Sequence, residues 1–300
     1  MRMNHPVVKG TTLNCEYVKH LDEFSNFPVR DEDVWICGSP KSGTTWTQEM
    51  VWMIMHNLDF EGAKEDIHIR VPFAELSWAA PHDENSPHHA RDTLGFIKKE
   101  YEKGPVCLKT HLPWQLLPRD IQEGLKKPKI IYVMRNAKDQ IVSMYHWNKM
   151  LYGYNEPLEK FFEGYLKNEY VYTPYWGHVF GFWKQRSKPN VMFLRYEEMS
   201  KDLPGMIRKV ANFVERPMSD EKVAKLVKHL SFDTMRKNPA VNNENLIEKC
   251  RKDRGLEKSE TNHMRQGKTG SHKTEMPPEL IEKVERWIED NTKGTDFVFW

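Results

Sequence analysis

Residues 34–46 read VWICGSPKSGTTW, an apolar run followed by a glycine-bounded turn and the start of a helical pattern. The run 34–37 is apolar at every position, which predicts a strand buried on both faces of a parallel sheet. Apolar residues then recur at helical spacing from Thr45 to about Leu58. Where a strand leads through such a turn into a helix, backbone N–H groups converge on an anion, and the helix dipole assists. The segment therefore predicts a P-loop-like phosphate-binding loop.

This loop departs from the nucleotide-triphosphatase consensus G-x-x-x-x-G-K-[ST] at the lysine. Gly38 and Gly43 have the consensus spacing, but Thr44 stands where the lysine would be, and Lys41 lies inside the loop. A nucleoside kinase holds its metal partly with an aspartate after a neighbouring strand, whereas the apolar run 130–134 is followed by Arg135. An arginine suits an additional anion on the ligand, so the pattern disfavours a kinase.

Three further apolar runs, 106–108, 130–134 and 191–194, have the same strand-like character. Helical patterns lie between and after them, from about 137 onward and at 158–170, 175–185, 203–214, 220–229 and 278–290. This alternation predicts an α/β fold, a single three-layer αβα domain over residues 1–300 with a central parallel sheet. Ligands of such sheets bind outside the carboxyl ends of the strands. We expect a polar N-terminal lead at 1–30, a long functional loop at 238–273, and docking of 297–300 as a strand or tail.

Composition excludes several classes of protein. The formal net charge is +2, which argues against a general nucleic-acid binder. No apolar h-region opens the chain and no stretch approaches the ~20 apolar residues of a membrane span, so neither a signal peptide nor a span is expected. The four cysteines form no C-x-x-C pair, which is typical of free thiols in a reducing compartment. A cytoplasmic address is therefore expected.

Two polar stretches could suggest other functions. Residues 82–89 contain histidines and acidic residues, but prolines interrupt the stretch and the spacing is not that of a metal site. Residues 249–258 are rich in lysine and arginine, but acidic residues interrupt the run. A solvated loop and a solvated face or lid are the interpretations we favour. No metal is expected.

Further motifs follow the loop 40–46 in order along the chain. They are Arg70-Val71-Pro72-Phe73, Lys109-Thr110-His111-Leu112-Pro113, residues 132–139, Ser143 with Tyr145-His146, Arg195-Tyr196-Glu197-Glu198-Met199, Lys237-Asn238-Pro239, and Arg265 with Gly267. Together these motifs resemble the cytosolic sulfotransferase family over nearly the whole chain. The resemblance implies transfer of a sulfuryl group from 3′-phosphoadenosine 5′-phosphosulfate (PAPS) to the hydroxyl of a small acceptor, leaving 3′,5′-adenosine bisphosphate (PAP). It also implies a role in detoxification or hormone metabolism.

The catalytic candidates are His111, Lys109 and Lys41. His111 follows a predicted strand, and its reference pKa of about 6.5 leaves it mostly neutral, as a general base must be. Lys109, two residues earlier, points to the same side of an extended segment and could neutralise developing charge together with Lys41. The resemblance implies these same roles, in an in-line transfer without a covalent enzyme intermediate. Because Lys41, Lys109 and His111 are all present, a non-catalytic nucleotide-binding or scaffold protein on the same fold is disfavoured.

The resemblance also implies the residues that bind the donor. The loop residues Lys41, Ser42, Gly43, Thr44 and Thr45 would surround the 5′-phosphate, and Trp46 and Phe232 would sandwich the adenine, with Tyr196 at its edge. The 3′-phosphate would contact Arg135, Ser143, Arg265 and Gly267. Gln266 stands where many relatives carry lysine.

The acceptor would be a phenol, sterol, retinoid or similar molecule. Phe24, Phe73 and Trp147 are expected among the walls of its pocket, with Lys109 and His111 at its reacting end. Some relatives use sulfation to eliminate water from an alcohol, and this alternative stays open. Many relatives pair through K-x-x-x-T-V-x-x-x-E. Here Lys273 and Glu282 fit, but prolines occupy 277 and 278. Because proline lacks a backbone donor, a monomer or weak homodimer is expected.

Overall fold

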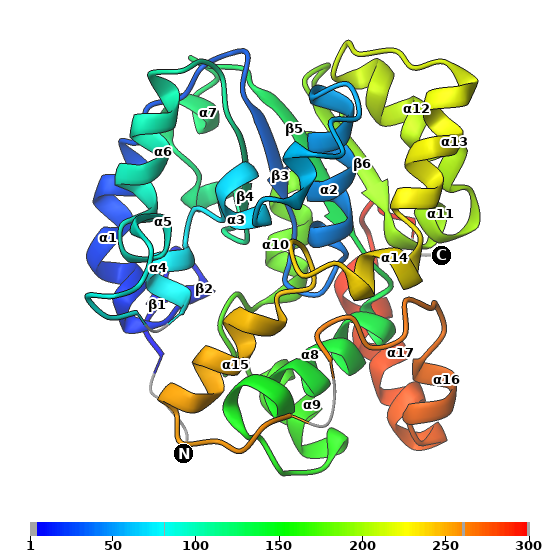
Figure 1. The fold of residues 1–300 in the computed structure, drawn as a ribbon. Helices are drawn as coiled ribbons and strands as arrows, with labels where there is room; N and C mark the ends of the chain where they lie inside the picture. Colours follow the sequence, from blue (N-terminus) through cyan, green and yellow to red (C-terminus); the bar gives the residue numbers. More distant parts are fainter. Residues whose placement is uncertain (1–4, 81, 260–261, 299–300) are drawn as a thin grey trace.

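A parallel sheet of four strands lies at the centre of the computed structural model, which describes residues 5–80, 82–259 and 262–298 (Figure 1). The strand order is β4-β3-β5-β6, and every neighbouring pair is parallel. The strands are β3 (Val34–Cys37), β4 (Cys107–Thr110), β5 (Lys129–Met134) and β6 (Val191–Arg195). The predicted α/β fold with a central parallel sheet is confirmed, and each predicted strand is present within two residues of its expected bounds.

Both faces of the sheet are apolar. Consecutive strand residues point to opposite faces, so a strand such as β3, whose residues are all apolar, contributes apolar side chains to both. Trp35 and Cys37 belong to one buried cluster, whereas Val34 and Ile36 belong to another. The first cluster includes residues of α1 (Cys15–Ser25), α6 (Thr93–Tyr101), α8 (Ala137–Tyr152), α9 (Leu158–Leu166), α10 (Tyr175–Trp183) and α17 (Pro278–Thr292). The second includes residues of α2 (Thr44–Met55), α11 (Tyr196–Lys201), α12 (Leu203–Phe213), α13 (Asp220–His229) and α14 (Phe232–Lys237). Helices therefore cover the sheet on two sides, and Figure 1 shows α1 and α6 opposite α12 and α13.

Short elements complete the described part of the chain. They are β1 (Val7–Val8), β2 (Thr11–Thr12), η1 (Gly62–Lys64), α3 (Ile67–Arg70), α4 (Leu76–Ala79), α5 (His88–Arg91), η2 (Trp114–Leu116), α7 (Arg119–Gln122), α15 (Glu244–Asp253) and α16 (His272–Glu275). Within the described ranges, no helix combines the length and apolar character that a bilayer crossing requires.

Two predicted irregular segments contain regular structure. The expected polar lead 1–30 forms the β1–β2 hairpin and α1, whose Tyr17 and Phe24 are buried in the core. The expected loop 238–273 contains α15, whose buried residues are Ile247 and Cys250. Few apolar residues lie among the charged ones here, so the sequence pattern did not indicate a helix. Packing of Ile247 and Cys250 against the rest of the fold stabilises it. Phe297 docks in the core as a tail, while 299–300 lie outside the described residues.

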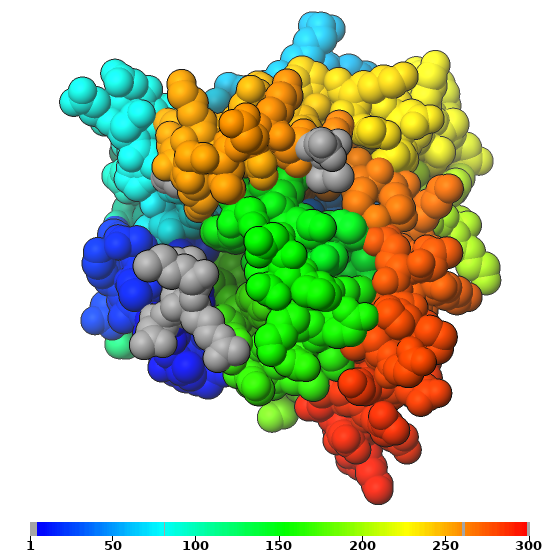
Figure 2. All heavy atoms as spheres, turned by 90° about the horizontal axis from the view of Figure 1, so that it is seen from below, coloured from blue at the N-terminus to red at the C-terminus, as the bar shows by residue number. Residues whose placement is uncertain are grey.

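The strand directions place the candidate residues at one edge of the sheet. The four strands end at Cys37, Thr110, Met134 and Arg195. Because all four are parallel, the segments that follow them meet at the same edge. Seen from below, α15 (orange) lies beside the α8–α9 region (green) and contacts α8 (Figure 2).

Candidate active site

A cavity of about 1760 Å³ lies at the carboxyl edge of the sheet. This exceeds the roughly 300–1,000 Å³ of a single small-ligand pocket, so the cavity has room for two molecules. Nearly every predicted nucleotide-side residue lines it: Lys41, Gly43, Thr44, Thr45, Trp46, Arg135, Ser143, Tyr196, Phe232, Arg265, Gln266 and Gly267. The predicted acceptor-side residues Phe73, Lys109, His111 and Trp147 line it too. Ser42 is fully buried beneath the loop.

The phosphate loop ends at the N-terminus of α2. Gly43 is the N-cap of this helix, and no side chain caps the first turn. The backbone N–H groups of that turn are therefore available to an anion, and the helix dipole adds to their attraction. Gly43 has a φ of 103°, and a Cβ there would lie 2.7 Å from Tyr196 Cδ2. Both the backbone conformation and the approach of Tyr196 require glycine.

His111 is held by three contacts. Its backbone N–H donates to Glu75 Oε1 at 2.8 Å, and its carbonyl lies 3.0 Å from His178 Nε2. Its ring Nδ1 lies 2.6 Å from the Gly38 carbonyl oxygen. Because a carbonyl only accepts, Nδ1 carries the proton, and Nε2 of the neutral ring keeps a lone pair. Burial, and then the charge of Lys109, hold the pKa of His111 well below its usual range, so the ring is neutral at physiological pH.

The two lysines have lowered pKa values; Lys109 is buried and Lys41 is half-buried. Burial, then the charges of Arg135 and Lys109, lower the pKa of Lys41 to about 7. Burial lowers the pKa of Lys109 to about 8, although Glu75 raises it. The Lys41 ammonium lies 4.7 Å from the Trp147 ring centroid, and that of Lys109 lies 4.4 Å from the Phe73 centroid. Both amines are thus held against aromatic walls, where an anionic ligand would raise their pKa values again.

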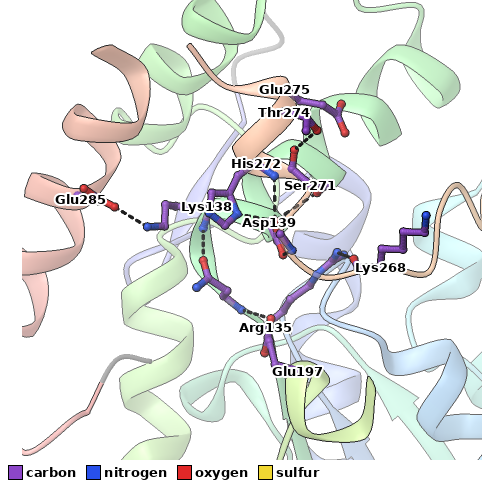
Figure 3. Close-up of polar contacts among 12 residues, drawn as sticks. Arg135, Lys138, Asp139, Glu197, Lys268, Ser271, His272, Thr274, Glu275 and Glu285 are labelled. Atoms are coloured by element: carbon purple, nitrogen blue, oxygen red, sulfur yellow. Dashed lines mark hydrogen bonds and ion pairs between the residues drawn. The ribbon is translucent and has the colours of Figure 1, made fainter. Parts of the chain in front are cut away.

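Arg135 stands between the phosphate loop and the C-terminal segment. Its guanidinium donates to the Lys268 carbonyl at 3.1 Å (Figure 3). It also donates to the Lys41 carbonyl at 3.4 Å and lies 4.4 Å from the Tyr196 ring centroid. Among the described residues, its Nε has no hydrogen-bond partner although it is buried, and the same holds for Ser42 Oγ. Donors in this state are what an anion site requires.

The C-terminal segment brings Arg265 and Gly267 to the same cavity. Gly267 has a φ of 64°, and a Cβ there would lie 2.1 Å from Phe232 Cδ2, so only glycine fits against this ring. Arg265 lines the cavity while its Nη1 donates to Glu275 Oε1 at 2.6 Å. Gln266 is exposed at the cavity margin.

Aromatic side chains line the region expected to hold the adenine. Trp46 lies edge-on to Tyr196, with ring centroids 5.7 Å apart, and its Nε1 donates to the Leu230 carbonyl at 3.0 Å. Phe232 lines the same cavity. The structure therefore brings together the three aromatic residues that the sequence assigned to the base.

Phe24 does not lie where the sequence placed it. Its side chain is fully buried in the core, with ring contacts to Phe27, Trp35 and Trp78, and it does not line the cavity. The assignment rested only on its position in the chain. Other aromatic residues line the cavity together with Phe73 and Trp147: Tyr17, Trp78, Tyr152, Tyr154, Tyr170 and Tyr172.

Two further residues of the site carried no sequence signal. Glu75 is fully buried, and burial raises the pKa of its carboxyl to about 7. The segment before it pairs with β4, with Phe73 bridged to Lys109, and this pairing brings Glu75 to His111. His263 lies with Nδ1 3.4 Å from Lys41 Nζ and its ring edge-on to Trp147. Neither residue belongs to a local motif, so long-range packing alone places them.

Comparisons with known proteins identify the family and the fold. The family described as sulfotransferase domain matches residues 31–296. Luciferin sulfotransferase of Photinus pyralis is 38% identical over 295 residues, which cover 96% of this chain and 79% of that protein. Sulfotransferase 1E1 of Homo sapiens is 34% identical over 296 residues, 97% of this chain and 94% of that protein. The crystal structure of retinol dehydratase with retinol and PAP aligns with a TM-score of 0.80 at 31% identity, covering 97% of this chain and 90% of that one.

Proposed function

The chain belongs to the sulfotransferase family, and from this premise we propose that it transfers a sulfuryl group from PAPS to the hydroxyl of a small, largely apolar acceptor with His111 as general base. The hydrogen bond from His111 Nδ1 to the Gly38 carbonyl carries the proposal. It leaves Nε2 unprotonated in a ring that faces the same cavity as Lys41 and Lys109. We further propose that one domain spans the whole chain.

The proposed mechanism follows from these positions. PAPS supplies the sulfuryl group, and the acceptor oxygen forms the new S–O bond as His111 Nε2 takes the hydroxyl proton. The S–O bond to the 5′-phosphate breaks at the same time, and Lys41 and Lys109 stabilise the charge on the sulfuryl and leaving oxygens. The first turn of α2 holds the 5′-phosphate, while Arg135, Ser143, Arg265 and Gly267 hold the 3′-phosphate. The unpartnered buried donors on Ser42 and Arg135 support this fit.

The acceptor class is supported by the walls of the cavity and by relatives. Aromatic and aliphatic side chains surround the part of the cavity beside Phe73 and Trp147. The aligned structures include retinol dehydratase with retinol and with androsterone, both apolar molecules that carry a hydroxyl. We therefore propose phenols, sterols and retinoids as the acceptors to be screened.

An acceptor screen with radiolabelled sulfate donor tests the proposed function. We expect sulfated products from hydroxyl-bearing apolar acceptors, in the presence of EDTA, and thermal stabilisation by PAP but not by magnesium–ATP. Mass spectrometry of the products separates a stable sulfate ester from an alkene formed by loss of water. Stabilisation by magnesium–ATP alone, or activity that needs added magnesium, would contradict the proposal.

Binding of PAP is expected to take up protons above neutral pH. The pKa values of Lys41 and Lys109 are about 7 and about 8 without ligand, and adjacent phosphates raise them. At pH 8, Lys41 is largely neutral before binding and charged after it. PAP affinity should therefore be strongest below these pKa values and should fall as the pH rises through them, by up to about tenfold per pH unit for each proton taken up.

Calorimetry at pH 8 in HEPES and in Tris measures this uptake, because the two buffers differ in ionisation enthalpy. The apparent binding enthalpy should differ between them, and the difference should shrink in Lys41→Met. Equal enthalpies in both buffers would refute a linked protonation.

Gln266→Lys is expected to tighten PAP binding. Gln266 lies at the cavity margin beside Arg265 and Gly267, where it supplies hydrogen-bonding capacity but no charge. Charge-assisted hydrogen bonds are roughly twice as strong as neutral ones. The gain should shrink at high ionic strength, because the position is exposed. Calorimetry of both proteins at two salt concentrations checks this, and unchanged affinity at low salt would remove Gln266 from the site.

A further inference from the structure

Asp139 holds the C-terminal segment that carries Arg265 and Gly267. It is the third residue of α8, after the N-cap Asn136, and its side chain is 1% exposed. Oδ2 accepts from the Gly270 backbone N–H at 2.6 Å. Oδ1 accepts from Ser271 Oγ at 3.2 Å, from the His272 backbone N–H at 3.0 Å and from His272 Nδ1 at 2.7 Å. One carboxylate thus fastens three successive residues to the start of α8 (Figure 3).

The same short segments supply the proposed 3′-phosphate ligands. Arg135 lies just before α8 and also donates to the carbonyl of Lys268, two residues before the segment of three residues that Asp139 holds. Gly267 precedes that segment and packs against Phe232. Asp139 therefore ties the chain just after Arg265 and Gly267 to the start of α8, next to Arg135.

The electrostatics favour a permanent anchor. Burial on its own would raise the pKa of the Asp139 carboxyl, but hydrogen bonds from His272 and Gly270 and the charge of Arg135 hold it well below its usual range. The carboxylate is therefore charged and fully engaged at neutral pH. Asparagine at this position would lose the charge and turn an NH₂ group toward donors, which would leave buried N–H groups without acceptors.

We propose that Asp139 is a positioning residue for recognition of the donor's 3′-phosphate, acting through the segment 268–272. The proposal rests on the proposed PAPS-dependent function. It predicts a specific defect, because the proposed contacts to the 5′-phosphate and to the adenine through Trp46 lie on α2, which Asp139 does not hold. Loss of the anchor should weaken ligands that carry a 3′-phosphate and spare those that lack it.

Calorimetry of Asp139→Asn with PAP and with AMP, which lacks the 3′-phosphate, tests this. We expect PAP affinity to fall by about tenfold or more, and AMP affinity to stay within about twofold. Lys138→Ala is the matched control, because Lys138 directly precedes Asp139 in the chain. Its ammonium pairs with Glu285 on α17 at 2.6 Å and, among the described residues, makes no hydrogen bond to residues 270–272. Both affinities should be unchanged in that variant.

A second pair of variants keeps the test decisive if Asp139→Asn folds poorly. His272→Ala removes the ring donor and should weaken PAP more than AMP, whereas His272→Asn, whose amide can replace Nδ1–H, should restore PAP affinity. Equal losses for PAP and AMP, or unchanged PAP affinity in all variants, would overturn the proposal. If the wild-type protein did not prefer PAP to AMP, the proposed function would fail instead.

Discussion

In His111→Ala we expect kcat to fall by roughly 10²–10⁴-fold, the usual cost of removing a general base. The reason lies in the ring's tautomer. Nδ1 donates to the Gly38 carbonyl 2.6 Å away, which leaves Nε2 unprotonated. In the proposed mechanism Nε2 takes the proton of the acceptor hydroxyl, and alanine would leave that proton without a base. Steady-state kinetics at saturating donor and acceptor measure the loss.

Two further measurements separate catalysis from structure. PAP affinity should be nearly unchanged in His111→Ala, because the base acts on the acceptor. His111→Asn keeps an N–H near the Nδ1 position and can still donate to Gly38, but it supplies no base, so it should be as inactive as alanine. Turnover within a few-fold of wild type in either variant would rule out His111 as the general base.

Lys41→Met should lower kcat by roughly 10²–10³-fold, the range seen when one transition-state hydrogen-bond donor is removed. The Lys41 amine lies 4.7 Å from the Trp147 ring centroid and 3.4 Å from His263 Nδ1. The residue is half-buried, and a charge there interacts more strongly than in bulk water. Methionine keeps most of the side-chain volume, so the aromatic contact survives while the charge does not. Single-turnover measurements at saturating PAPS isolate the chemical step from weaker donor binding.

Lys149→Met is the matched control for this substitution. Lys149 lies on α8 only two residues beyond Trp147, but it is exposed and its ammonium lies 5.3 Å from the Tyr145 ring centroid, outside the cavity lining. Its turnover should equal that of wild type. An equal loss in both lysine variants would point to a general electrostatic effect and would contradict a specific role for Lys41.

Local patterns were sufficient for the sheet and the phosphate loop, whereas the family resemblance supplied most of the candidate site residues that line the cavity. The apolar runs predicted all four strands of the parallel sheet. The helical pattern predicted a helix from Thr45 to about Leu58, and α2 spans Thr44–Met55. The helix predicted from about residue 137 is α8, which begins at Ala137. These features depend on neighbours in the chain: a strand and its turn are encoded within a few residues, and parallel strands then bring their following segments to one edge.

Tertiary structure alone decided the features that depend on contacts between distant segments. Phe24 lies in the core because α1 packs against Trp35 and Trp78, although nothing in its neighbourhood distinguishes a core aromatic from a pocket aromatic. Glu75 reaches His111 across 36 residues, and Asp139 reaches His272 across 133. Burial makes these polar contacts strong, because a carboxylate removed from water must find donors within the protein. The chain sequence specifies which chemical groups are present, and only the packing of the folded chain specifies which of them meet.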